Sequence, residues 1–213
     1  MLFRSVFEEI DYSFMQEEMD VLTAEEFLQA LSYAPICKRI NVKANFTVSG
    51  NSFGIPETQT VYIEDGVTLT VNAWNVYVEG KIISDGLLKI NSGLIFYTNT
   101  DGNLTGNYSV SPGGWLTIYG EMNADDIAKY LSEDSIYNDC NVIAEDMQQL
   151  IIDRDLTIPK GKRLSFGYYD HTLVVNEGIT LNNLGTITTY MTPIINGTIT
   201  GNPVELLYNP LNK

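Results

Sequence analysis

The chain has 213 residues, 44% of them hydrophobic, and is long enough to bury a substantial core as one large domain or two small ones. Its 27 aspartates and glutamates outnumber its 12 lysines and arginines, which gives a formal net charge of -15. Such a field repels phosphate backbones and anionic lipids, and no stretch approaches the ~18 apolar residues of a membrane span, so we expect neither a nucleic-acid partner nor membrane insertion.

The first predicted element is an amphipathic helix over residues 3–19. Apolar residues recur there at three- and four-residue steps, at Phe3, Phe7, Ile10 and Phe14. A short strand around Tyr12-Ser-Phe14 is the alternative. Residues 1–22 also carry too many acidic residues for a signal peptide, which taken alone predicts a cytoplasmic protein.

Two further helices are predicted from their starting residues. Thr23-Ala-Glu-Glu26 has the pattern of a capping box, followed by Phe27, Leu28 and Leu31 as the buried stripe and by Pro35 near the end. Asn123-Ala-Asp-Asp126 opens the second helix in the same way, with Ile127 and Leu131 on its apolar face. The acidic pairs at such starts favour helix N-termini.

Short strands of alternating Leu, Ile or Val with Thr or Asn follow each of these two helices. The strand-rich segments match each other at drifting offsets of 110, 112 and 117 residues: Phe46–Val48 with Leu156–Ile158, Ile63–Leu69 with Val175–Leu181, and Glu79–Ile82 with Asn196–Ile199. Loop insertions between copies of one unit produce such drift. We therefore predict two modules, 1–110 and 111–213, each a helix followed by a ladder of strands, stacked as one continuous domain.

The strands allow two all-β folds. Hairpin signals flanked by apolar runs occur at Asp65-Gly66, Asp85-Gly86, Asp101-Gly102 and Asn196-Gly197, and these favour an antiparallel domain. The recurring phrase of apolar-Thr-apolar, a glycine step and apolar-Thr-apolar favours a parallel β-helix, or solenoid, in which like residues stack at about 4.8 Å. We predict the solenoid, with short helices at the N-terminus and between the modules.

Three phrases carry a resemblance to a known family: Leu156–Leu164, Asp170–Val175 and Asn176–Ile187, after a helix of the Thr23–Leu31 type. They resemble the pectate-lyase-like repeat domains of bacterial surface proteins. The resemblance implies a right-handed parallel β-helix, adhesive and non-catalytic, whose first coil is covered by a helix. It also implies an extracellular or bacterial cell-surface location, and any export signal would then lie upstream of residue 6. The loop Ser49–Pro56 departs from the family's phrase.

Aromatic residues in or beside strands are the candidate binding residues, because outward-facing rings can stack on the apolar faces of sugars: Trp74, Tyr77, Trp115, Tyr119, Tyr168 and Tyr169. Filling of the solenoid interior is the competing interpretation. Trp74 and Tyr77 lie an odd number of residues apart, so in a regular strand they would face opposite sides.

No catalytic residue, metal site or cofactor is predicted. A polysaccharide lyase would need a base beside acidic residues that hold Ca²⁺, and only one segment has these residue types: Asp153-Arg154-Asp155 with Lys160, Lys162 and Arg163. We interpret it as solvated charge on an edge turn. The single histidine, His171, is expected to turn a corner. Cys37 and Cys140 fit no metal spacing and are expected to be buried, with one disulfide between them left open.

The leading hypothesis from the sequence is therefore a non-catalytic, extracellular or cell-surface β-helix that binds a polysaccharide or a protein surface in adhesion. The alternatives are a carbohydrate-active β-helix enzyme, whose site residues the sequence does not assemble, and a phage tail-fibre or spike segment, in which trimerisation would be the structural purpose.

Overall fold

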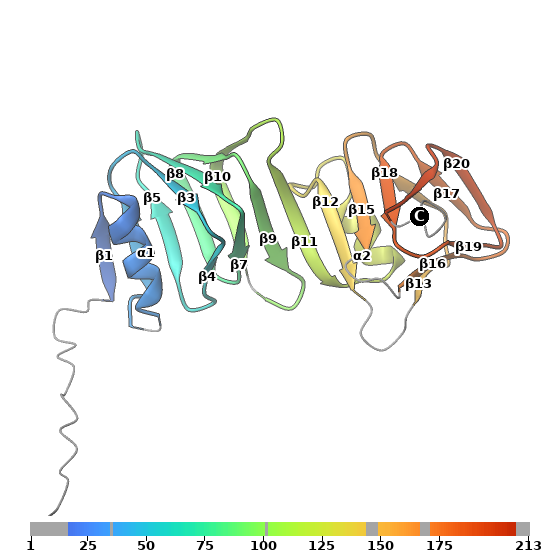
Figure 1. The fold of residues 1–213 in the computed structure, drawn as a ribbon, viewed down its shortest axis with the longest axis horizontal. Helices are drawn as coiled ribbons and strands as arrows, with labels where there is room; N and C mark the ends of the chain where they lie inside the picture. Colours follow the sequence, from blue (N-terminus) through green and yellow to red (C-terminus); the bar gives the residue numbers. More distant parts are fainter. Residues whose placement is uncertain (1–16, 35, 101, 144–148, 167–170, 208–213) are drawn as a thin grey trace, which may run out of the picture.

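The computed structural model describes residues 17–34, 36–100, 102–143, 149–166 and 171–207. They form a parallel β-solenoid of about 8 turns with two short helices. Figure 1 shows the coils stacked along the long axis, from β1 at one end to β18, β19 and β20 at the other. Neither described helix is long and apolar enough to cross a membrane.

The first part of the chain builds two faces of the solenoid in one sheet. One face contains β1 (Glu18–Val21), β2 (Arg39–Val42), β5 (Thr60–Ile63) and the start of β8 (Lys81–Ile90). The other contains β3 (Phe46–Gly50), β6 (Thr68–Ala73) and the end of β8. Strand β10 (Asn103–Val110) pairs with β8 along its start and its end, and so lies on both faces. Because β8 turns the corner without a break, the two faces share it.

The second part repeats these two faces as separate three-stranded sheets. One consists of β13 (Gln149–Ile152), β16 (Thr172–Val175) and β19 (Ile194–Ile195). The other consists of β14 (Leu156–Ile158), β17 (Thr180–Asn183) and β20 (Thr198–Gly201).

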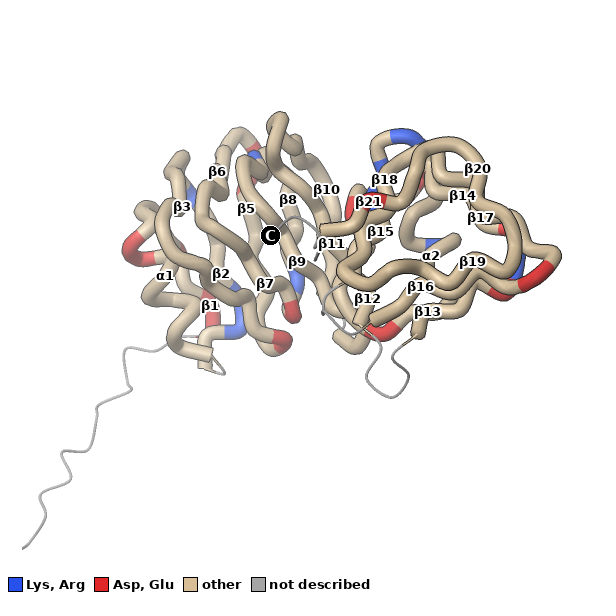
Figure 2. Tube along the Cα trace, turned by 45° about the vertical axis from the view of Figure 1, so that its right-hand side comes forward, with Lys and Arg blue, Asp and Glu red and all other residues tan. Residues whose placement is uncertain are grey.

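The third face is a single sheet that runs through both parts and across the predicted module boundary between residues 110 and 111. In spatial order it contains β4 (Phe53–Ile55), β7 (Asn75–Val78), β9 (Gly93–Tyr97), β11 (Trp115–Glu121), β12 (Asp139–Ile143), β15 (Arg163–Phe166), β18 (Thr186–Thr189) and β21 (Val204–Leu206). In Figure 2 the first part is seen side on while the coils around α2 are seen nearly end on, so the stack changes direction where α2 lies.

The core consists of columns of inward side chains in exact register. On the third face one column contains Phe96, Ile118, Cys140, Leu164 and Ile187, each paired with the next across parallel strands and each at most 3% exposed. Stacked aliphatic and aromatic groups remove their surface from water at roughly 25 cal/mol per Å². The alternation of apolar and polar residues thus produces an inner column and an outer column on every face.

Helix α1 (Ala24–Ser32) contacts β1, β2 and β3 at the start of the first part, and α2 (Ala124–Tyr130) contacts β13 and β14 at the start of the second. Both predicted starts are confirmed: the Thr23 hydroxyl accepts from the backbone N–H of Glu26, and Asn123 forms a reciprocal capping box with Asp126.

The apolar face of α2 is as predicted, whereas that of α1 is narrower. Ile127 and Leu131 are buried, as are Phe27 and Leu31. Leu28, predicted to be buried, is 40% exposed, because it follows Phe27 directly and so points away from the strip that faces the coil.

The antiparallel hairpin alternative is wrong, because every pairing between the described strands is parallel. Gly86 lies inside the continuous strand β8, where a Cβ would come within 2.2 Å of the carbonyl oxygens of Glu64 and Val67. Gly197 has the same environment, because a Cβ there would come within 2.3 Å of the carbonyl oxygens of Asn176 and Ile179. These glycines therefore permit close approach of neighbouring coils.

The positions of these glycines correct one of the predicted matches between the two modules. Phe46–Val48 and Leu156–Ile158 occupy equivalent strands, β3 and β14, as predicted. The structural counterpart of Gly197 is Gly86, at the corner between the first two faces, whereas the predicted counterpart Gly80 lies at the corner before β8.

The predicted helix over residues 3–19 lies mostly outside the described residues. Its last part is wrong, since Glu18 and Met19 belong to β1 and pair with Arg39 and Ile40 of β2. Alternation of apolar and polar residues over Glu18–Val21 suits a strand on the solenoid better than it suits a helix face.

Candidate functional site

The outer surface of the eight-stranded sheet is hollowed near its middle. One hollow of about 610 Å³ is lined by residues from β7 to β18, and a second of about 630 Å³ adjoins it at the start of α2. Tyr97 and Tyr119 line both. We call the two together the tyrosine groove. Since one hollow draws its lining from strands as distant as β7 and β18, the sheet is concave here.

Two outer columns of the sheet form the floor of the tyrosine groove. The first runs through Tyr77, Ile95, Thr117, Asp139 and Arg163, which pair in register across β7, β9, β11, β12 and β15. The second runs through Tyr97, Tyr119, Asn141, Ser165 and Thr188, across β9 to β18. The floor is therefore aromatic over the first strands and polar over the later ones.

Four rings make up the aromatic half of the groove. Tyr77 and Tyr97 lie stacked with centroids 6.4 Å apart, and Tyr97 meets Tyr119 edge to face at 5.7 Å. Such pairs stabilise each other by about 0.5–1.5 kcal/mol beyond area burial. Trp115 lies against Gly93 on β9, where a Cβ would come within 2.7 Å of the indole Nε1. All four rings are half-buried, so part of each remains open to the groove.

The polar half is organised by Asp139, whose side chain is only 9% exposed. One carboxylate oxygen accepts from the Thr117 hydroxyl at 3.1 Å. The other accepts from the Ser165 hydroxyl at 2.9 Å and lies 3.4 Å from Nε of Arg163. The buried negative charge is thereby compensated, and the Arg163 guanidinium is held beside the groove.

Two side chains of the polar half keep hydrogen-bonding capacity. The Arg163 side chain is 45% exposed, and in the described part of the chain its Nη groups have no acceptor. Asn141 is half-buried, and its Oδ1 is enclosed without a hydrogen-bond partner among the described residues. A buried polar atom without a partner costs about 1–3 kcal/mol, so Asn141 is not placed there for stability.

The structure brings three of the six predicted binding residues together: Tyr77, Trp115 and Tyr119 line the groove. Trp74 does not line it. It lies between β6 and β7, 78% exposed, so it turns a corner instead of joining Tyr77 on a strand. Tyr168 and Tyr169 lie outside the described residues.

Sequence reasoning missed Tyr97, Asp139, Asn141 and Arg163 as groove residues. A signal for Tyr97 was available, because it lies 22 residues before Tyr119, which is one coil away. No comparable signal marked the polar residues, since their meeting depends on the register of β12 and β15 after the α2 insertion.

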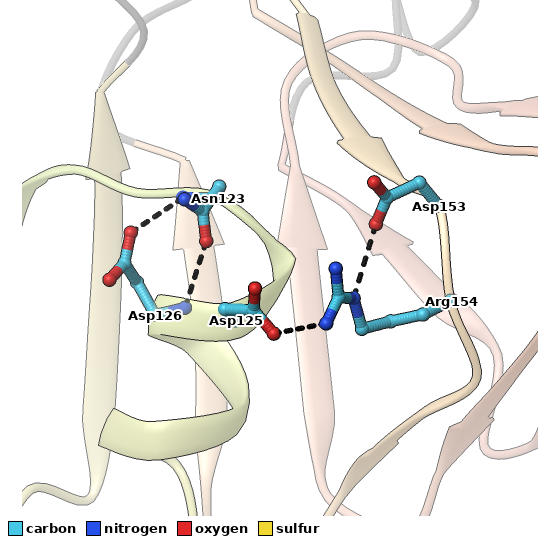
Figure 3. Close-up of polar contacts among 5 residues, drawn as sticks. All are labelled: Asn123, Asp125, Asp126, Asp153 and Arg154. Atoms are coloured by element: carbon cyan, nitrogen blue, oxygen red, sulfur yellow. Dashed lines mark hydrogen bonds and ion pairs between the residues drawn. The ribbon is translucent and has the colours of Figure 1, made fainter.

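The charged segment considered for lyase chemistry does not converge. Figure 3 shows Arg154 between Asp125, at the start of α2, and Asp153, whose Oδ1 is 3.4 Å from the Arg154 Nε. The Asp155 carboxylate accepts from the backbone N–H of Thr180 at 2.7 Å. These charges have local partners.

Two other basic residues of that segment, Lys162 and Arg163, contact other parts of the molecule. Lys162 Nζ donates to the carbonyls of Ser135 and Tyr137 at 2.8 and 2.7 Å, and burial lowers its pKa. Arg163 lies on the third face with Asp139. The charged residues of this one segment therefore lie in three separate environments and do not form one site.

His171 is buried directly before β16. Cys37 and Cys140 are free and buried, and burial raises the pKa of both thiols. Over the described ranges, no cluster of three or more His, Cys, Asp or Glu residues is arranged to hold a metal ion.

Comparison of the chain with protein-family models, with curated proteins and with solved structures gives no match.

Proposed function

We propose that the chain is a non-catalytic glycan-binding module that serves in adhesion, in the extracellular space or at a bacterial cell surface. The observation that carries the proposal is the tyrosine groove, in which four half-buried rings adjoin a cluster of hydrogen-bonding side chains on one concave sheet. Sugars present apolar ring faces and hydroxyl edges, and a site for them needs both kinds of group.

The engagement of Asp139 supports binding over hydrolysis. A glycosidase needs two carboxyl groups that flank the bond to be broken. Both oxygens of Asp139 already accept from Thr117 and Ser165, and Arg163 lies beside one of them. The carboxylate thus has the surroundings of a structural anchor. The parallel solenoid also supports the resemblance to pectate-lyase-like surface domains, although the groove itself carries the functional argument.

The two tryptophans of the chain provide a matched test. Trp115 lines the groove, whereas Trp74 is exposed at a corner outside it. We expect Trp115→Ala to weaken glycan binding by about tenfold, which is about 1.4 kcal/mol, and Trp74→Ala to leave it unchanged. Affinities would be measured by calorimetry for sugars selected from an immobilised glycan panel.

Circular dichroism of both variants controls for folding. Equal effects of the two substitutions would contradict the placement of the site in the groove. Absence of any bound glycan, with folded protein, would contradict the proposed function itself.

A further inference from the structure

The ligand class can be narrowed further, on the basis of the proposed function. From the groove's length, charge and donors we infer that it takes an uncharged oligosaccharide of several sugar units, which lies along the solenoid axis. Arg163 is assigned as a hydrogen-bond donor to its hydroxyl or ring oxygens.

The length of the groove excludes a single sugar as the complete ligand. Its lining comes from six consecutive strands of the sheet, β7, β9, β11, β12, β15 and β18. Neighbouring strands lie about 4.8 Å apart, so the five intervals span roughly 24 Å. This distance accommodates several linked sugar rings. Because the columns cross the strands, a chain that follows them lies along the solenoid axis.

The charge of the groove disfavours an acidic polymer. Among the described lining residues, Arg163 is the one cation, whereas Asp139, Glu121 and Asp126 are acidic. Glu205 pairs in register with Thr188 and adds another carboxylate at the far end. The chain as a whole carries a formal charge of -15. In Figure 2, acidic and basic positions are interspersed along both parts of the chain.

The position of Arg163 explains how a cationic side chain can bind a neutral ligand. Its Nε faces the Asp139 carboxylate at 3.4 Å, so a neighbouring negative charge already balances the guanidinium. Its Nη groups have no acceptor in the described part of the chain, and they carry N–H donors beside the groove. Hydroxyl and ring oxygens of a sugar can accept from them. A ligand carboxylate would instead compete with Asp139 and meet its repulsion.

Calorimetric titration with matched ligands tests the inference. The probes are neutral oligosaccharides built from glucose, galactose, mannose or N-acetylhexosamine, each from the monosaccharide to the longest soluble oligomer, and the uronate counterparts of the hexoses. We expect the dissociation constant of the best neutral series to fall at least about tenfold with length and then level off. We expect the uronates to bind at least about tenfold more weakly and to improve with added salt.

Arg163 variants separate donation from charge recognition. We expect Arg163→Ala to weaken neutral binding about fivefold and Arg163→Gln, which keeps N–H donors, to restore most of it. Tighter binding of a uronate, no gain with length, or failure of the glutamine to restore affinity would overturn the inference. These results would leave the glycan-binding function standing, whereas that function falls if no sugar binds to the folded protein.

Discussion

The aromatic and polar halves of the tyrosine groove have the same backbone and different chemistry. Tyr97 and Tyr119 occupy the same outer column as Asn141 and Ser165, one coil after another. Beneath both halves the inner columns remain apolar and buried, for example at Phe96, Ile118, Cys140 and Leu164. The solenoid core therefore constrains only every second residue of a strand, and the outer residues can change in kind without loss of the fold.

The largest expected loss of stability comes from removing the carboxylate that organises the polar half of the groove. Asp139→Ala removes the acceptor of Thr117 and Ser165 and leaves Arg163 without its ion-pair partner. Hydrogen bonds to a charged group contribute about 1.5–3 kcal/mol, and we expect a loss of about 2–3 kcal/mol in the free energy of unfolding, measured in urea. Ser165→Ala, which removes one donor, should cost about 1 kcal/mol. Equal losses of stability in Asp139→Ala and Ser165→Ala would show that Asp139 does not organise the polar half of the groove.

A smaller effect is expected from crowding the aromatic half. A methyl group on Gly93 would lie 2.7 Å from the Trp115 indole and 2.9 Å from Oδ1 of Asn75, so Gly93→Ala must displace the ring. We expect a loss of about 1 kcal/mol and a red shift of Trp115 fluorescence, measured in a Trp74→Phe background.

Gly54→Ala is the matched control for that substitution. Gly54 pairs with Tyr77 in the same sheet, and its added Cβ would meet only the Tyr77 carbonyl at 3.8 Å. An unchanged spectrum of Gly93→Ala, or the same shift in the control, would contradict the contact between Gly93 and Trp115.

The fold could be predicted from the sequence because stacked coils need similar residues at equivalent positions, and this need produces a repeating residue pattern. The apolar-Thr-apolar phrases and the offset between Phe46–Val48 and Leu156–Ile158 both reflect strands at equivalent positions of a coil. Hairpin-like dipeptides such as Asp85-Gly86 are ambiguous locally. Only the neighbouring coil, whose carbonyls come within 2.2 Å of a Gly86 Cβ, determines why a glycine is needed.

The site could be predicted only in part, since it depends on how residues about one coil apart come into register. Tyr77, Trp115 and Tyr119 were predicted because they are aromatic residues in or beside strands, and Tyr97 lies one coil before Tyr119. Asp139 and Arg163 lie 24 residues apart, with strands of two other faces between them in the chain. Nothing in that spacing marks them as partners until the register of β12 with β15 is known.

Asn141 allows a test in which the polar half is made more stable and less functional. Its Oδ1 has no hydrogen-bond partner in the described chain, so Asn141→Val removes a desolvated acceptor and adds a β-branched residue to a strand. We expect a gain of about 1 kcal/mol, or ~2–4 °C in Tm by calorimetry, together with weaker glycan binding.

The satisfied asparagine of the first part is the control. Asn41 on β2 accepts from Arg39 Nε at 2.8 Å and donates to Asp20 at 3.1 Å, so Asn41→Val should lower stability. A loss of stability in both variants would show that Asn141 has a structural role of its own.

A pH-dependent effect is expected where the first and second parts of the solenoid meet. Tyr137 lies two residues before the start of β12 and packs against Phe96 of β9 at 5.5 Å and Tyr130 of α2 at 5.8 Å between ring centroids. Burial raises the pKa of its phenol from 10.0 to about 12. The folded state therefore holds this proton more tightly than the unfolded state does. Its contribution to stability is complete below pH 10 and is lost as the pH rises to about 12.

Urea unfolding at a series of alkaline pH values measures this contribution. The Cys140 thiol, whose pKa is also raised by burial, weakens the fold in the same direction from its ordinary value of 9.0 upward. The difference between the native chain and Tyr137→Phe therefore isolates the phenol. The hydrogen bond to Asp85 also raises the pKa of the Tyr62 phenol, but Tyr62 is present in both chains and its contribution cancels in that difference. If Tyr137→Phe unfolds with the same alkaline profile as the native chain, then solvent reaches the phenol, and the contact between the two parts of the solenoid is looser than its ring packing implies.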